Sequence, residues 1–153
     1  MPVQAKDTTD TKEHKVENQG KTPTLFAPIP DDVERVGKAV LDAAYKMHST
    51  LGPGLLESVY ETCLAYKVRE SGIAVQTQVA LPIVYEKLKI DSGLRLDLLA
   101  GNCVVVELKA VDVMYPVYQS QLLTYLKLSH FRLGFLINFN VTRLKSGIIR
   151  MVV

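Results

Sequence analysis

The spacing of apolar side chains changes along the chain from a helical period to a strand period. From Asp31 onward, apolar residues recur at intervals of three and four, which is typical of an amphipathic helix. The turn residues Gly52-Pro53-Gly54 end this pattern, and a second helical pattern covers residues 55–70. Gly72 follows as a C-terminal stop. The sequence therefore predicts two consecutive helices before any strand.

Beyond Gly72 the pattern is that of β-strands. Pro82 cannot donate a hydrogen bond to a sheet, so we expect its strand to lie at an edge or to contain a bulge. Asp91-Ser92-Gly93 predicts one turn, and Gly101-Asn102 predicts a tight hairpin. The predicted elements are strands at 73–85, 94–100 and 103–111, a helix at 117–129, and strands at 132–138 and 148–153.

The first thirty residues differ from the rest of the chain. They are polar, carry charges of both signs and contain almost no large apolar residue before Leu25 and Phe26. Such a segment cannot bury enough apolar surface to fold, so we predict a disordered tail over residues 1–30. The remaining residues, 31–153, have the length and apolar content of one folded domain.

Charge and cysteine content narrow the functional classes. The formal net charge of +2 is too small to indicate nucleic-acid binding by itself. Cys63 and Cys103 lie in apolar surroundings, which favours reduced thiols and a cytoplasmic location. No secretory apolar region follows Met1, and no apolar run reaches the roughly 18 residues that a membrane span requires. We therefore expect no membrane partner.

The predicted hairpin around Gly101-Asn102 brings three ionisable residues together. In a simple register Asp97 lies near Val106 or Glu107, and Glu107 shares one strand face with Lys109. Charges at the end of a buried strand are costly unless they are paired or bind an ion. The hairpin therefore indicates a site.

Asp97 and Glu107 in this arrangement could hold one hard divalent cation, with the backbone carbonyl of Leu108 as a further ligand. Lys109 could then orient an attacking water or stabilise negative charge that develops on a phosphate. The alternative is a surface strand end with an ordinary Glu–Lys pair, which contributes only about 0–1 kcal/mol to stability.

Two further pairs of polar residues lie on the predicted helices. Glu57 and Tyr60 stand three residues apart in a first helical turn that follows Gly54, and Gln121 and Tyr125 stand one turn apart. The second pair could bind a phosphate oxygen or a water ligand. Taken alone, an acid near a helix N-terminus and a polar helix face are the better interpretations of these pairs.

Together, and in this order, the motifs resemble the PD-(D/E)XK nuclease superfamily and, within it, the GxxExxY family. The resemblance covers roughly residues 31–153. It implies an α/β fold with a restriction-endonuclease-like core, in which helices flank a mixed β-sheet in the order α-α-β-β-β-α-β-β. The motifs that carry it are Gly54-x-x-Glu57-x-x-Tyr60, Arg95-x-Asp97-Leu98, Val106-Glu107-Leu108-Lys109-Ala110, Gln121-Leu122-Leu123-x-Tyr125-Leu126 and Leu136-Ile137-Asn138-Phe139.

The resemblance also implies roles for individual residues. The metal-binding acids of the superfamily match Asp97 and Glu107, and its lysine matches Lys109. The acid supplied by the first core helix matches Glu57, which becomes a further candidate ligand. A glutamine-and-tyrosine helix, known in recombination exonucleases of the superfamily, matches the helix at residues 117–129 through Gln121 and Tyr125. Leu96 stands before Asp97 where the family pattern has a proline, at a position that varies.

The sequence therefore predicts a Mg²⁺- or Mn²⁺-dependent nuclease that hydrolyses phosphodiester bonds, with DNA favoured over RNA. Glu57, Asp97, Glu107 and Lys109 are the predicted catalytic residues. Supporting roles toward the substrate or the ligands fall to Tyr60, Gln121 and Tyr125. The alternatives are a nucleic-acid-binding module without turnover, a regulatory partner in a larger assembly, and an enzyme that hydrolyses a small phosphate ester.

Overall fold

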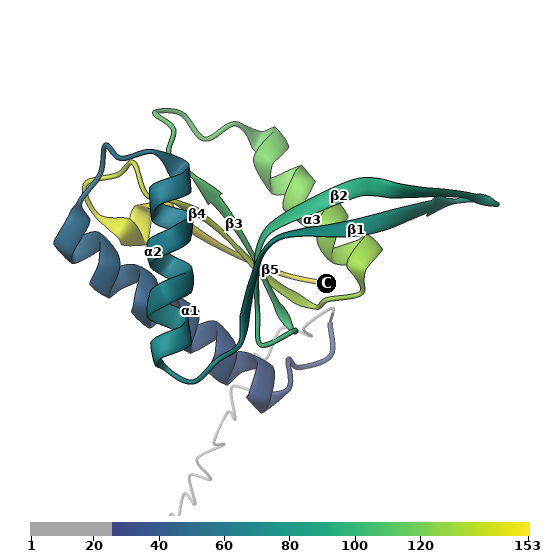
Figure 1. The fold of residues 1–153 in the computed structure, drawn as a ribbon, viewed down its shortest axis with the longest axis horizontal. Coiled ribbons are helices and arrows are strands. Elements are labelled where there is room, and N and C mark those ends of the chain that lie inside the picture. Colours follow the sequence, from purple (N-terminus) through teal and green to yellow (C-terminus); the bar gives the residue numbers. More distant parts are fainter. Residues whose placement is uncertain (1–25) are drawn as a thin grey trace, which may run out of the picture.

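Residues 26–153, which the computed structural model describes, form a mixed five-stranded sheet with helices on both faces (Figure 1). The strands follow the order β1-β2-β3-β4-β5, in which β3 and β4 are parallel and the other neighbours are antiparallel. This confirms the predicted α/β fold class and element order. The elements are α1 (Asp31–Leu51), α2 (Glu57–Glu70), β1 (Val75–Tyr85), β2 (Leu88–Ala100), β3 (Val104–Lys109), α3 (Pro116–Ser129), β4 (Leu133–Asn138), a 3₁₀ turn (Leu144–Gly147) and β5 (Ile148–Val152).

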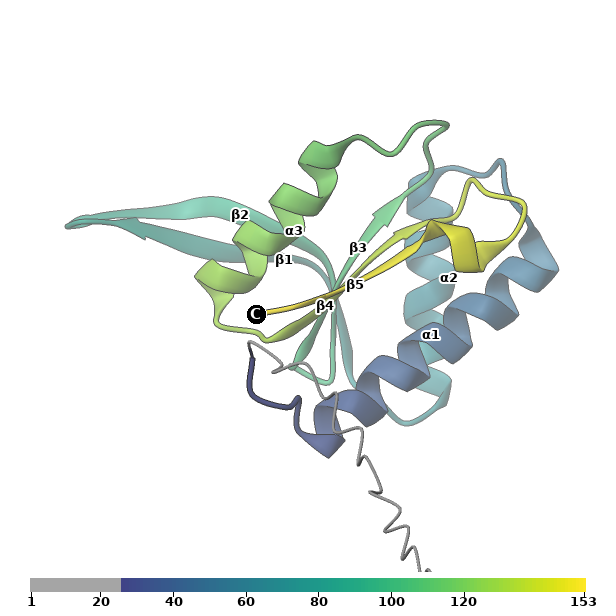
Figure 2. The ribbon, with the colours of Figure 1, turned by 180° about the vertical axis from the view of Figure 1, so that it is seen from behind.

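The sheet separates two apolar layers. Helices α1 and α2 lie side by side on one face, and α3 lies on the other (Figures 1 and 2). Side chains of β3 alternate between the layers: Val106 joins the core under α1 and α2, and Val105 packs with Leu122 and Leu126 of α3. Because β3 and β4 are covered on both faces, their sequences are almost continuously apolar. These two strands therefore form a rigid support for the polar side chains at their ends.

Gly134 in β4 sets how closely α3 approaches the sheet. A Cβ at this position would lie 3.0 Å from Leu122 Cδ1 and 3.1 Å from Leu126 Cδ2, tighter than ordinary packing. The glycine thus allows the two leucines to rest directly on the strand. This contact fixes the height of α3, and with it the height of the polar side chains on the same helix.

The structure corrects the first predicted turn and confirms the second. The residues expected to turn, Asp91-Ser92-Gly93, lie inside β2, and the β1–β2 turn is formed by Glu86 and Lys87. Gly93 serves a different purpose, because Ile83 occupies the space that a Cβ there would need. The hairpin at Gly101 and Asn102 is present, with left-handed φ values of 56° and 53°.

The long β1–β2 hairpin extends past the body of the domain as an arm (Figure 1). Pro82 lies in this hairpin on the edge strand β1, where the register shifts between Leu81 and Ile83. Both features match the expectation for a proline in a sheet. Strand β2 begins at Leu88 rather than at the predicted residue 94, because the ladder continues to the Glu86-Lys87 turn.

Residues 1–25 of the predicted tail lie outside the described part of the chain, but residues 26–30 contact the domain. Arg132 donates hydrogen bonds to the carbonyl oxygens of Ala27 (2.6 Å) and Pro28 (3.1 Å). The half-buried Ile29 packs against the core under α1 and α2. Among the described residues, none of the helices is long and apolar enough to cross a membrane.

We predict that two truncations separate the contribution of these contacts. A chain without residues 1–25 should fold, whereas a chain without residues 1–30 should fold with a free energy of unfolding lower by about 1–3 kcal/mol. The loss combines the packing of Ile29 with two hydrogen bonds to Arg132. Urea unfolding followed by circular dichroism measures the difference. Equal stability of the two truncated chains would contradict the prediction.

Candidate active site

The candidate site forms where the ladder between β2 and β3 ends and the two strands diverge. Their antiparallel ladder runs from Ala100↔Val104 to Leu98↔Val106, so the next facing residues are Asp97 and Glu107. Beyond this point the two strands diverge in Figure 1. Divergence leaves backbone N–H groups without ladder partners, and buried N–H groups require an acceptor.

Asp97 and Glu107 supply those acceptors to each other's strands. An oxygen of Glu107 accepts a 3.3 Å hydrogen bond from the backbone N–H of Asp97. An oxygen of Asp97 accepts a 3.0 Å hydrogen bond from the backbone N–H of Leu108. The two carboxyl groups therefore extend the hairpin past its last ladder pair.

Glu107 is the most perturbed acid of the described residues. Only 4% of the residue is exposed, and the pKa of its carboxyl is raised to about 9, chiefly by this burial. The charge of the neighbouring Asp97 and a hydrogen bond with its side chain contribute to the rise, against smaller opposing effects of the Asp97 N–H and Lys109. Without a cation, Glu107 therefore holds a proton at neutral pH.

Lys109 completes the group on β3. It shares a strand face with Glu107, and its positive charge lowers the pKa values of both Glu107 and Glu57. Its Nζ lies 4.6 Å from the ring centroid of Tyr118, within the range of a cation–π contact. The backbone carbonyl of Lys109 accepts a 2.9 Å hydrogen bond from the N–H of Phe139, which anchors the end of the strand.

Helix α2, on the opposite face of the sheet from α3, brings Glu57 close to Asp97 and Lys109. Partial burial raises the pKa of Glu57, and the charges of Asp97 and Glu61 raise it further. The charge of Lys109 and a hydrogen bond from the backbone of Ala110 lower it. The structure thus brings the four predicted charged residues together at the end of β3.

Tyr60, also on α2, lies apart from this group. Its side chain is fully buried and stacks on Phe139 with ring centroids 4.7 Å apart. Its hydroxyl donates to the Gly52 carbonyl (2.6 Å) and accepts from the Leu55 N–H (3.2 Å). Tyr60 was predicted to support Glu57 or the substrate; in the structure its contacts are with the turn that starts α2 and with Phe139. Residues three apart on a helix differ in direction by about 60°, so Tyr60 faces the core while Glu57 remains exposed beside it.

Gln121 and Tyr125 reach the carboxyl pair from α3. The amide of Gln121 donates a 2.6 Å hydrogen bond to the Tyr125 hydroxyl oxygen. Burial raises the pKa of Tyr125, and the charges of Glu107 and Asp97 raise it further despite the hydrogen bond from Gln121. Because the hydroxyl already accepts from Gln121, its own proton remains available to a further acceptor.

The structure adds two residues that the sequence analysis missed. Glu61 lies one turn after Glu57, and burial together with the charge of Asp97 raises its pKa. Its carboxylate accepts a 2.6 Å hydrogen bond from Gln78, which has a left-handed φ of 53° within β1. The spacing between Glu57 and Glu61 could have identified Glu61. No sequence pattern signals a left-handed glutamine inside a strand.

The acids fit a hard divalent cation. Within residues 26–153, no group of three His, Cys, Asp or Glu side chains is arranged to hold a metal ion by itself. Mg²⁺, however, keeps several waters and commonly binds one or two protein carboxylates. Asp97 and Glu107 provide such a pair, with Leu108 beside it. A cation there would also relieve the cost of placing two acids together, which raises the pKa of Glu107.

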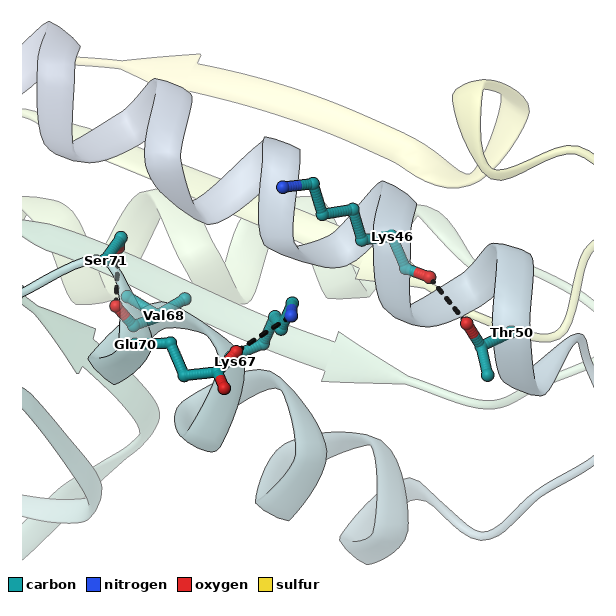
Figure 3. Close-up of polar contacts among 6 residues, drawn as sticks. All are labelled: Lys46, Thr50, Lys67, Val68, Glu70 and Ser71. Carbon is teal, nitrogen blue, oxygen red and sulfur yellow. Dashed lines mark hydrogen bonds and ion pairs between the residues drawn. The ribbon is translucent and has the colours of Figure 1, made fainter.

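A separate cavity of about 230 Å³ lies between α1 and α2. Two of its polar side chains, those of Thr50 and Lys67, are engaged within their own helices, as Figure 3 shows. Lys67 pairs with Glu70 at 2.8 Å, and the hydroxyl of Thr50 donates to the carbonyl of Lys46 at 3.3 Å. We therefore assign no function to this cavity.

We predict that Glu107→Gln reduces the pH dependence of stability. The folded protein binds more protons than the unfolded chain between the ordinary pKa of glutamic acid and about 9. The free energy of unfolding should therefore fall as pH rises through this window, by at most about 1.4 kcal/mol per pH unit. The slope should be smallest at the low-pH end of the window. Urea unfolding in EDTA from pH 5 to 9 measures the slope. Parallel curves for the wild type and the variant would contradict the assignment.

Comparison with known proteins is consistent with this geometry. A family model described as the PD-(D/E)XK nuclease superfamily matches residues 34–151, which includes every element except the first residues of α1 and the end of β5. The searches of curated proteins and of solved structures returned no significant match.

Proposed function

Because the chain belongs to the PD-(D/E)XK nuclease superfamily, we propose that it is a Mg²⁺- or Mn²⁺-dependent nuclease of the GxxExxY family that hydrolyses DNA. Membership indicates a nuclease with a nucleic-acid substrate and an α/β restriction-endonuclease-like fold. Nucleases of this superfamily usually use divalent metal ions. The metal, the preference for DNA and the subfamily are the parts that we add.

The observation that carries the proposal is the reciprocal pair of Asp97 and Glu107 next to Lys109. Each carboxyl is held by a backbone N–H of the opposite strand, so its position is fixed. A buried acid of raised pKa beside a second acid is characteristic of functional sites. A structural ion pair would instead match acids and bases in number, and here Lys109 faces several acids.

In this proposal Asp97 and Glu107 hold the cation, with the Leu108 carbonyl and Glu57 as further ligands. The cation supplies charge stabilisation for the phosphate that is attacked. The ammonium of Lys109 orients the attacking water and stabilises negative charge on the phosphate oxygens. Tyr125, whose hydroxyl accepts from Gln121, donates its own proton to a phosphate oxygen and steadies the phosphate.

We also propose a cytoplasmic location. Cys63 and Cys103 are free thiols in the structure. Free cysteines are typical of compartments that keep thiols reduced.

We predict that Lys109→Ala abolishes cleavage while leaving metal binding largely intact, whereas Asp97→Ala loses both. Loss of a group that stabilises the transition state should lower the cleavage rate at least about 100-fold. Single-stranded, duplex and branched DNA and RNA should be incubated with Mg²⁺, Mn²⁺ or chelator, and metal binding should be measured by calorimetry. Lys127→Ala, an exposed lysine of α3, serves as the control.

Equal loss of metal binding in Lys109→Ala and Asp97→Ala would contradict the separate roles. Binding of nucleic acid without cleavage under every condition would favour the alternative of a binding module that retains the nuclease fold.

We predict that millimolar Mg²⁺ or Mn²⁺ raises the melting temperature of the wild-type protein. A ligand at 100 times its dissociation constant stabilises the folded state by about 2.7 kcal/mol. The effect should vanish in Glu107→Gln and weaken in Glu57→Gln. Glu70→Gln, on the same helix but paired with Lys67, is the matched control and should keep the full shift. An unchanged melting temperature in the wild type would remove the proposed cation site.

A further inference from the structure

The segment that joins β3 to α3, residues 110–115, is held in place by the end of β4. The buried side chain of Asn138 accepts from the N–H of Val111 (3.1 Å) and donates to its carbonyl oxygen (2.9 Å). The amide of Asn140 donates to the carboxylate of Asp112 at 2.7 Å. These bonds satisfy polar groups at the base of the loop and hold it in one conformation, so the side chains on the loop have fixed positions.

This fixed loop and the first turn of α3 present apolar side chains to solvent. Val113, Tyr115 and Val117 are 55%, 57% and 62% exposed. Single exposed apolar residues need no explanation, whereas a group of them on an anchored support can form a recognition surface. The loop begins directly after Lys109, so this surface adjoins the proposed active site.

The ring of Tyr115 is connected to the site by two direct contacts. It packs edge-to-face against Tyr118, with ring centroids 6.0 Å apart and planes inclined by 74°. The ring of Tyr118 lies under the ammonium of Lys109. A phosphate held at Lys109 would therefore place the neighbouring nucleotide within reach of Tyr115, whose ring is both oriented by Tyr118 and largely exposed.

The charge around the site explains why such a ring would be needed. Glu57, Glu61 and Glu107 all lie close enough to Asp97 for its charge to raise their pKa values. A polyanion approaching these acids is repelled wherever a cation does not screen them, so phosphate contacts alone bind it poorly. Stacking of a base on an aromatic ring supplies attraction that is independent of this charge.

We propose that Tyr115 is a stacking platform for one unpaired base next to the phosphate held at Lys109, which makes single-stranded nucleic acid the preferred substrate. Bases within a duplex are already stacked on their neighbours, so a base must be unpaired or displaced before it can lie on a side chain. This inference rests on the proposed function, because it takes the position of the phosphate from it. Tyr115 here contacts the substrate without acting on the reacting bond.

The chain has no tryptophan, so Tyr115→Trp places one fluorescent reporter at the platform. We would introduce it together with Glu107→Gln, which prevents cleavage and mimics the protonated acid, and titrate a short thymine DNA strand. Emission should be quenched by this strand and by a uracil RNA strand, but not by an abasic strand of equal length or a blunt duplex. Tyr66→Trp, 64% exposed on α2 beside the separate cavity, is the matched control and should not respond.

Binding measurements in the same Glu107→Gln background complete the test. Tyr115→Ala should raise the Kd for the thymine strand by about 5- to 100-fold, and Tyr115→Phe should leave it within about twofold because a phenyl ring stacks equally well. The abasic strand should bind all variants alike. Equal affinity for abasic and base-bearing strands, or an unquenched reporter at position 115, would overturn the platform.

The outcomes also separate this inference from the proposed function. Quenching and base-dependent binding without cleavage by the wild-type protein would retain the platform and reject hydrolysis. Metal-dependent cleavage that is unchanged in Tyr115→Ala and equally fast on duplex would retain hydrolysis and reject the platform.

Discussion

The exchange of hydrogen bonds between Asp97 and Glu107 is the constraint on which the candidate site depends. Where β2 and β3 diverge, each carboxyl takes up a backbone N–H of the opposite strand. The hairpin thereby keeps its two strands in register past the last ladder pair, Leu98↔Val106. The same bonds hold the two acids side by side, so the stability of the hairpin and the placement of the acids cannot be separated.

Holding two acids together costs free energy, and the packing of the sheet is what keeps them in place. Glu107 lies at the end of a strand whose preceding residues are completely buried between α3 on one face and α1 with α2 on the other. A strand packed on both faces cannot shift to expose its last acid to water. The carboxyl responds with a pKa raised to about 9. The proposed cation would relieve this cost, which would link metal binding to stability.

The other polar residues are delivered by elements from opposite layers. Helix α2 carries Glu57 and Glu61 to the end of β3, and α3 carries the Gln121–Tyr125 pair. Tyr60 shows how a motif residue can act at a distance: buried against Phe139, it holds the glycine turn that starts α2. The anchored loop after Lys109 then extends the site toward an exposed aromatic surface.

By itself the sequence determined the order of helices and strands, the Gly101-Asn102 hairpin and the joining of Asp97 to Glu107. The period of apolar residues, the turn residues and the register of a hairpin depend on residues close together in the chain, so the sequence pattern predicts them. It placed the first turn wrongly, because Gly93 is needed for close approach of Ile83 rather than for a bend. Only the tertiary structure decided that Glu61 and Gln78 join the acids, that Tyr60 faces the core and that Tyr115 packs on Tyr118, the ring beside Lys109. These contacts depend on how separate elements pack, which spacing along one chain does not encode.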